Sequence, residues 1–182
     1  MTEISENPAG LALTPPERDP ASPFGIYLHV PFCSTRCGYC DFNTYTAGEL
    51  GSATSPVDWE RAAAIEIDRA AEALARSGTP PLVDTVFVGG GTPSLVDADV
   101  LVGMLDRIRS AFGLASDAEV TTESNPESTS PEFFSRLREG GYTRISLGMQ
   151  STSARVLTIL DRTHTPGRPQ EAVAEAISAS RT

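Results

Sequence analysis

Four short apolar segments, each followed by a stretch with helical character, constrain the fold of this chain more than any other feature. Short runs of apolar and β-branched residues, bounded by glycine, proline or polar residues, are typical of buried strands. Because strands that alternate with helices form parallel sheets, this order predicts an α/β protein with a parallel sheet or barrel. The predicted strands are residues 25–31 (GIYLHVP), 84–88 (DTVFV), 118–123 (AEVTTE) and 144–147 (RISL).

The segments between these strands carry helix signals. Residues 57–76 are rich in alanine, and Ile65, Ala71 and Leu74 stand among acids and arginines, which predicts an amphipathic helix. Aspartate at position 97 is a candidate N-cap, and a proline at position 131 suits a first helical turn. Further helices are therefore expected over 97–112 and 131–139, followed by a helix pair after residue 150 that breaks at 165–169.

The bulk composition favours one globular domain. The formal net charge of −10 argues against non-specific electrostatic binding to nucleic-acid phosphates, so nucleic acid is not expected as a partner. No apolar run approaches the roughly 20 residues of a transmembrane segment. Residues 1–22 are polar and rich in proline, which predicts a disordered tail rather than a secretory signal. The core domain is expected over 23–182, and the expected localisation is cytoplasmic.

All three cysteines fall within eight residues, as Cys33, Cys37 and Cys40, spaced C-x3-C-x2-C. Three thiolates on one loop can hold three irons of a [4Fe–4S] cluster and leave the fourth iron open. Structural zinc is the alternative, but it normally takes four protein ligands. His29 is the nearest candidate for a fourth ligand, although it is predicted to lie within a strand. Chance clustering of unliganded cysteines is the third possibility.

Polar or glycine-rich residues follow the other predicted strands directly, where parallel barrels bind ligands. Gly89-Gly90-Gly91 would let the backbone approach a ligand closely, or would simply form a tight turn. Glu123 ends the third strand, either at a site or as a solvated carboxylate. Because side chains alternate along a strand, Tyr27 and His29 are expected on the same face.

The segment YLHVPFCSTRCGYCDF resembles the radical-SAM superfamily, and within it the oxygen-independent coproporphyrinogen III oxidase-like family. Further agreement comes from FVGGGTPSL at 87–95, ESNPES at 123–128, and RISLGMQS with LDRTH within 144–164. The resemblance implies an incomplete (βα) barrel with parallel strands. It also implies that the open iron is chelated by S-adenosylmethionine, which the reduced cluster cleaves to a 5′-deoxyadenosyl radical.

The same resemblance implies roles for individual residues. Without it, Arg162 would be read as an exposed surface charge, as most arginines are. His164 belongs to a family-like segment but has no role that the sequence assigns. The implied cluster ligands are Cys33, Cys37 and Cys40, and the implied S-adenosylmethionine contacts are Tyr27, Tyr39, Gly90, Gly91, Thr92, Glu123, Gln150 and Arg162.

Phe42 stands where the coproporphyrinogen oxidases carry a fourth cysteine, which favours the heme-chaperone (HemW-type) subgroup. That subgroup implies heme, heme-acceptor proteins and an electron donor as partners, with porphyrinogen oxidation as the alternative activity. Family members continue beyond a point corresponding to Thr182, so a truncated core with an exposed sheet edge is expected, and enzyme activity stays open. A zinc-bound interaction module or an inactive fragment is the alternative of another class.

Overall fold

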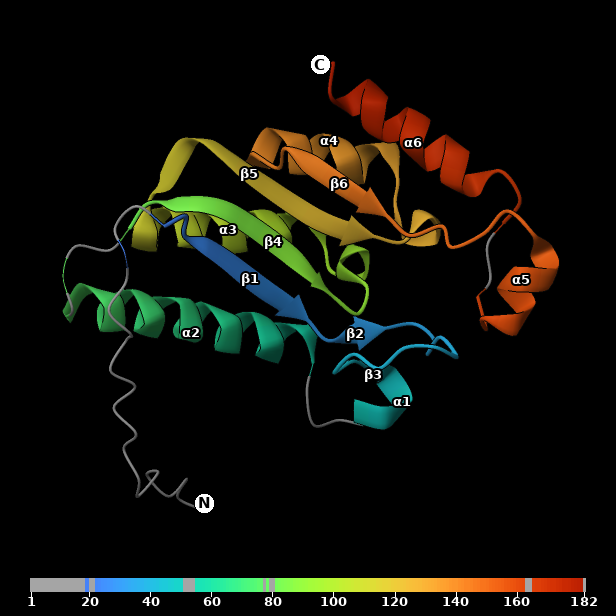
Figure 1. Ribbon diagram of the computed structural model, residues 1–182, viewed down its shortest axis with the longest axis horizontal. Coiled ribbons are helices and arrows are strands. Elements are labelled where there is room, and N and C mark those ends of the chain that lie inside the picture. Colours follow the sequence, from blue (N-terminus) through green and yellow to red (C-terminus); the bar gives the residue numbers. More distant parts are fainter. Residues whose placement is uncertain are drawn as a thin grey trace.

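The computed structural model describes residue 19 and residues 22–50, 55–76, 78, 81–162 and 165–181 (Figure 1). The N-terminal segment 1–22, expected to be a disordered tail, therefore lies almost wholly outside the described residues, as does His164.

A four-stranded parallel sheet forms the centre of the molecule, as the sequence predicted. Its strands run in the order β1-β4-β5-β6, which is also their order along the chain. Each adjacent pair is parallel, so all four carboxyl ends lie at one edge of the sheet. The strands are β1 (Gly25–Val30), β4 (Val83–Gly90), β5 (Leu114–Ser124) and β6 (Arg144–Leu147).

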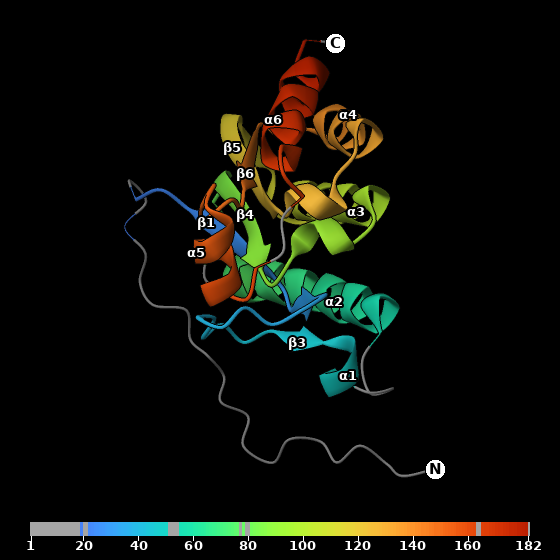
Figure 2. The same cartoon turned by 90° about the vertical axis from the view of Figure 1, so that its right-hand side faces the viewer.

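Helices cover one face of this sheet. Figure 2 shows α2 (Pro56–Arg76), α3 (Ala98–Phe112) and α4 (Pro131–Gly140) on one side of the strands, and Figure 1 shows α5 (Ala154–Ile159) beyond the carboxyl ends of the strands. The helix α6 (Arg168–Ala179) packs beside α4. The core between sheet and helices includes Leu28, Val30, Val86, Val88 and Val120 from the strands and Leu101, Leu105 and Ile108 from α3.

The helix termini follow the sequence signals. The Asp97 carboxylate accepts a hydrogen bond from the Asp99 N–H at 2.8 Å and caps α3. Ser130 caps α4 in the same way, accepting from the Phe133 N–H. At the other end of α4, Gly141 takes a left-handed conformation with φ of 101°, which a residue without Cβ adopts at little cost.

Two details of the helices differ from expectation. The face of α2 that packs on the sheet is led by Trp59, Ala63 and Ile67, spaced four residues apart, whereas Ile65 is 45% exposed. An alanine-rich helix gives a weak apolar stripe, so its buried face depends on what it packs against. The predicted break at 165–169 is also displaced, because Arg168 and Pro169 already belong to α6, whose first turn accommodates proline.

Three short elements around the cysteine loop were not predicted. The strand β2 (Phe32–Cys33) pairs in parallel with β3 (Tyr45–Thr46), and the helix α1 (Ala47–Leu50) follows β3 directly. Elements of two to four residues carry no readable periodicity. They nevertheless matter, because β2 and β3 bracket the cysteine loop.

The sheet ends at β6, which pairs with β5 alone among the described residues. None of the helices in the described part of the chain is long and apolar enough to cross a lipid bilayer.

Candidate functional site

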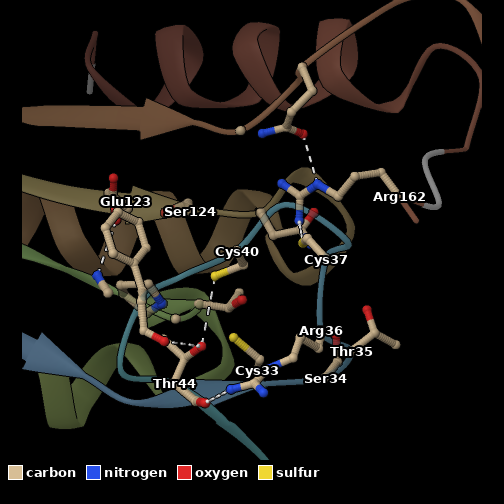
Figure 3. Close-up of a pocket in the computed structure, with 18 of the residues that line it drawn as sticks. Cys33, Ser34, Thr35, Arg36, Cys37, Cys40, Thr44, Glu123, Ser124 and Arg162 are labelled. Carbon is tan, nitrogen blue, oxygen red and sulfur yellow. Dashed lines mark hydrogen bonds between the residues drawn. The ribbon is translucent and has the colours of Figure 1, made fainter. Parts of the chain in front are cut away.

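A pocket lies at the carboxyl ends of the four parallel strands, where the sequence placed its motifs (Figure 3). Gly90 ends β4, Glu123 lies one residue before the end of β5, and Gly148 follows β6. The cysteine loop closes the pocket from the β1 side. The pocket lining includes Cys33, Cys37, Tyr39, Cys40, Gly90, Gly91, Thr92, Glu123, Gln150 and Arg162, so ten of the eleven predicted site residues meet there.

The cysteine loop is held by its own backbone and by β3. Cys33 lies in β2 opposite Thr46, and the Cys40 N–H donates to the Cys37 carbonyl at 3.1 Å. From within the loop, Arg36 Nη2 donates to the Thr44 carbonyl at 2.9 Å. All three cysteines are free thiols at the pocket wall, partly exposed to solvent. Contacts within the chain therefore define the shape of this loop.

The arrangement of these thiols bears on the choice between zinc and a cluster. Across the described residues, no three histidine, cysteine or acidic side chains converge closely enough to hold a single metal ion. Three sulfurs spread around one pocket instead suit a cubane, because each thiolate binds a different iron. His29 does not line the pocket; Nδ1 lies 2.9 Å from Tyr27 Oη and Nε2 lies 2.8 Å from the Asn43 carbonyl oxygen. Among the described residues, the three thiols at one pocket therefore suit the cluster better than a single zinc ion, and His29 is not placed to complete a zinc site.

The glycine loop packs directly on the cysteine loop. The Gly91 N–H donates to the Val30 carbonyl at 2.7 Å, and the Thr92 N–H donates to the Phe32 carbonyl at 2.7 Å. A Cβ on Gly91 would lie 2.4 Å from the Phe32 carbonyl oxygen and 3.0 Å from Cys33 Sγ. Only glycine allows this approach, so the loop is more than a tight turn.

Glu123 and Tyr27 lie on the sheet face opposite the helices. Glu123 Oε2 accepts a hydrogen bond from the Gly90 N–H at 3.2 Å, which directs the carboxylate toward the glycine loop. Partial burial, and secondarily the charge of Glu123, raise the pKa of Tyr27. Tyr27 itself lies outside the pocket lining, 57% exposed, with its ring stacked on Phe87.

The opposite wall of the pocket carries Arg162 and Gln150. Arg162 lies in the turn after α5, rather than within a helix as expected. Its Nε donates to Gln150 Oε1 at 2.8 Å and its Nη1 donates to Cys37 Sγ at 3.3 Å. Partial burial raises the pKa of the nearby Tyr39, and the positive charge of Arg162 opposes that rise. The pocket thus presents a carboxylate on one wall and a guanidinium on the other.

Comparison with known proteins agrees with this geometry, because the chain matches the radical SAM superfamily over residues 27–182. The chain belongs to the radical SAM superfamily. Membership confirms the resemblance read from the motifs and implies S-adenosylmethionine and a [4Fe–4S] cluster as cofactors.

Individual radical SAM relatives resemble the chain over most of its length. It is 58% identical to the heme chaperone HemW of Mycobacterium tuberculosis (strain H37Rv) over 159 residues, 87% of this chain and 40% of that protein. Identity to the heme chaperone HemW of Escherichia coli K12 is 37%, over 87% of this chain and 39% of the relative. The chain thus spans about 40% of the length of these relatives.

Solved structures support the same fold. The structure of Escherichia coli coproporphyrinogen III oxidase (HemN), described as a radical SAM enzyme, superposes with a TM-score of 0.72 at 25% identity. The match covers 90% of this chain and 35% of the oxidase. Methylornithine synthase (PylB) matches with a TM-score of 0.52 at 12% identity, which supports the fold alone. The predicted α/β partial barrel is thereby confirmed.

Sequence reasoning missed several polar residues of this radical SAM pocket. Ser124, Asn125 and Ser146 line it beside the predicted residues. The Asn125 N–H donates to Ser94 Oγ at 2.9 Å, while the buried Ser124 Oγ has no hydrogen-bond partner among the described residues. For Ser124 and Asn125 the available signal was their position directly after Glu123, whereas Ser146 comes beside Glu123 only through the pairing of β5 with β6.

Proposed function

We propose that the chain holds a [4Fe–4S] cluster on Cys33, Cys37 and Cys40 and binds S-adenosylmethionine beside the open iron. The observation that carries the proposal is that ten predicted residues, from segments far apart in the chain, line one pocket. When bound and reduced, the cluster supplies the electron that cleaves the sulfonium of S-adenosylmethionine. Everything else at the site is binding and orientation by the residues of this chain.

The charges of the pocket suit the amino-acid end of S-adenosylmethionine. That end carries an ammonium and a carboxylate, and the pocket presents Glu123 and Arg162. Charge-assisted hydrogen bonds of this kind both hold and orient a ligand. Gly90, Gly91 and Thr92 would bring backbone close to the ligand because no glycine Cβ intervenes. Tyr39 would cover one side of the pocket. Tyr27 lies outside the lining, so it would contact only a part of the cofactor that extends beyond the pocket along the open face of the sheet.

For the whole protein, we infer a role of the heme-chaperone type, in which heme is passed to acceptor proteins and an electron donor reduces the cluster. The relatives named heme chaperone support it at 58% and 37% identity. Phe42, 66% exposed beside the loop, occupies the position of the oxidases' fourth cysteine, which argues against porphyrinogen oxidation.

Anaerobic iron–sulfur reconstitution followed by EPR of the reduced protein tests the cofactor site. We expect a [4Fe–4S]⁺ signal that changes on addition of S-adenosylmethionine and disappears in Cys33→Ala. Thr35→Ala, in the same loop but with a side chain that is no cluster ligand, is the matched control and should retain the signal. Stoichiometric zinc without a cluster signal would overturn the proposal.

Heme binding needs its own measurement. Titration of the reconstituted protein with hemin should shift the Soret band at about one heme per chain if the heme-chaperone inference holds. A cluster signal responsive to S-adenosylmethionine without any Soret change would retain the cofactor site and reject heme binding by this chain.

A further inference from the structure

The turn after α5 contacts the cysteine loop at two neighbouring residues. The Gly38 N–H donates to the Leu160 carbonyl at 3.2 Å, and Arg162 Nη1 donates to Cys37 Sγ at 3.3 Å. Between these contacts, Asp161 lies so close that a Cβ on Gly38 would be 2.6 Å from Asp161 Oδ2. Three consecutive residues of the turn therefore pack on the part of the loop that begins at the second cysteine.

The backbone of this turn is unusual. In the described part of the chain, Gln150 and Asp161 are the two non-glycine residues with positive φ, at 58° and 51°. Left-handed backbone is unfavourable for residues with a Cβ, although aspartate tolerates it better than most. The two residues meet through one side chain, since Arg162 follows Asp161 and its Nε donates to Gln150 Oε1 at 2.8 Å. Strain concentrated around one guanidinium indicates that the backbone serves to place it.

We propose that residues 160–162 form a clasp on the cysteine loop, and that the left-handed turn at Asp161 positions this clasp. The turn redirects the chain between Leu160 and Arg162, so that a carbonyl and a guanidinium reach adjacent residues of the loop together. The clasp also joins the loop to the segment after β6 through Gln150. Asp161 acts as a positioning residue, because its own side chain contacts Gly38 rather than a cluster ligand.

The inference rests on the proposed function where it concerns the cluster, but the clasp itself consists of contacts within the chain. It predicts that cluster retention depends on the backbone conformation at position 161 more than on its carboxylate. Asn tolerates left-handed backbone, whereas a β-branched residue does not. Asp161→Asn and Asp161→Val therefore form a matched pair.

Two measurements apply to this pair. In the metal-free protein, deuterium uptake of the peptide that contains Cys37 and Gly38 should be roughly tenfold faster in Asp161→Val and within about twofold of wild type in Asp161→Asn. After anaerobic reconstitution, the rate of iron loss to a chelator should follow the same order. Equal behaviour of the two variants, or no effect of Asp161→Val, would overturn the clasp. Far-UV circular dichroism and the thermal midpoint establish that each variant is folded.

A second test changes Gly38, the partner of Asp161 in the cysteine loop. It still tests the clasp if Asp161→Val fails to fold. The methyl group of Gly38→Ala would collide with Asp161 Oδ2, so iron loss should be roughly fivefold faster. Adding Asp161→Gly removes the carboxylate, keeps the left-handed turn accessible, and should restore the wild-type rate within about twofold. Failure of the double variant to recover would count against the contact.

The outcomes separate the two proposals. If the wild-type chain takes up no cluster, the proposed function fails, while deuterium uptake of the metal-free variants still decides whether the clasp exists. If wild type holds a cluster and all variants hold it equally, the clasp alone is rejected.

Discussion

Glu123 Oε2 accepts a hydrogen bond from the Gly90 N–H at 3.2 Å and so joins the ends of two neighbouring parallel strands. This contact orders the glycine loop and at the same time holds one negative charge at the pocket. A carboxylate so placed can serve the fold, a cationic ligand group, or both. Substitutions can separate these roles.

Glu123→Gln keeps an acceptor oxygen for Gly90 but removes the charge. We expect the affinity for S-adenosylmethionine, measured from the EPR change of the reduced cluster, to fall about tenfold. The reason is that a hydrogen bond to a charged group stabilises a complex by about 1 kcal/mol more than a hydrogen bond between neutral groups. Glu119→Gln, on the same strand face and paired with Arg144 in solvent, is the control and should bind normally. Equal affinities of the two variants would exclude Glu123 as a cofactor contact.

Gly91→Ala should disturb the cysteine loop directly. The added methyl group would meet the Phe32 carbonyl and Cys33 Sγ, so we expect about 1–3 kcal/mol of destabilisation and a cluster content well below that of wild type. Gly103→Ala lies in the middle of α3 with open space around it and should be neutral or stabilising by up to about 1 kcal/mol. Urea unfolding and iron analysis measure both effects. Full cluster content in Gly91→Ala would contradict the close packing of the two loops.

Gln150→Gly separates backbone strain from side-chain function. Glycine relieves the left-handed conformation at φ of 58°, so the free energy of unfolding should stay equal or rise by up to about 1 kcal/mol. The same variant loses the amide that accepts from Arg162, so the response of the EPR signal to S-adenosylmethionine should weaken. An undiminished response would show that the Gln150 side chain is dispensable.

Tyr142 gives a pH dependence to stability that is independent of the site. Its buried hydroxyl donates to the Leu101 carbonyl at 2.9 Å, and burial raises the pKa of the phenol well above its usual 10.0. Because the pKa is higher in the folded than in the unfolded state, this contribution is complete below pH 10 and is lost as the pH rises beyond it.

The expected loss for Tyr142 approaches about 1.4 kcal/mol per pH unit for one proton. Tyr142→Phe should cost about 1 kcal/mol at neutral pH and show a shallower decline between about pH 10 and pH 11. Urea unfolding of both proteins across this range provides the comparison. Parallel curves would place the alkaline loss of stability elsewhere in the chain.

Sequence reasoning reached the main strands and helices because each carries its own local signal. The alternation of apolar residues in β1, the cap at Asp97 and the glycine pair that ends α4 are all readable without tertiary contacts. The pairing of β2 with β3 was not predicted, because strands of two residues are stabilised by their partner and carry no sequence pattern of their own. The exposure of Ile65 was not predicted for a related reason, because the packing of α2 against the sheet decides which of its faces is buried.

By itself, the sequence determined the parallel α/β order, the spacing of the three cysteines and the position of each motif after a strand. Parallel strands then bring those motifs to one edge of the sheet by geometry alone. Only the tertiary structure decided that Tyr27 lies outside the pocket and that Arg162 reaches Cys37 across 125 residues of chain. Contacts between distant segments depend on the backbone direction at residues such as Asp161, and no local pattern records that direction.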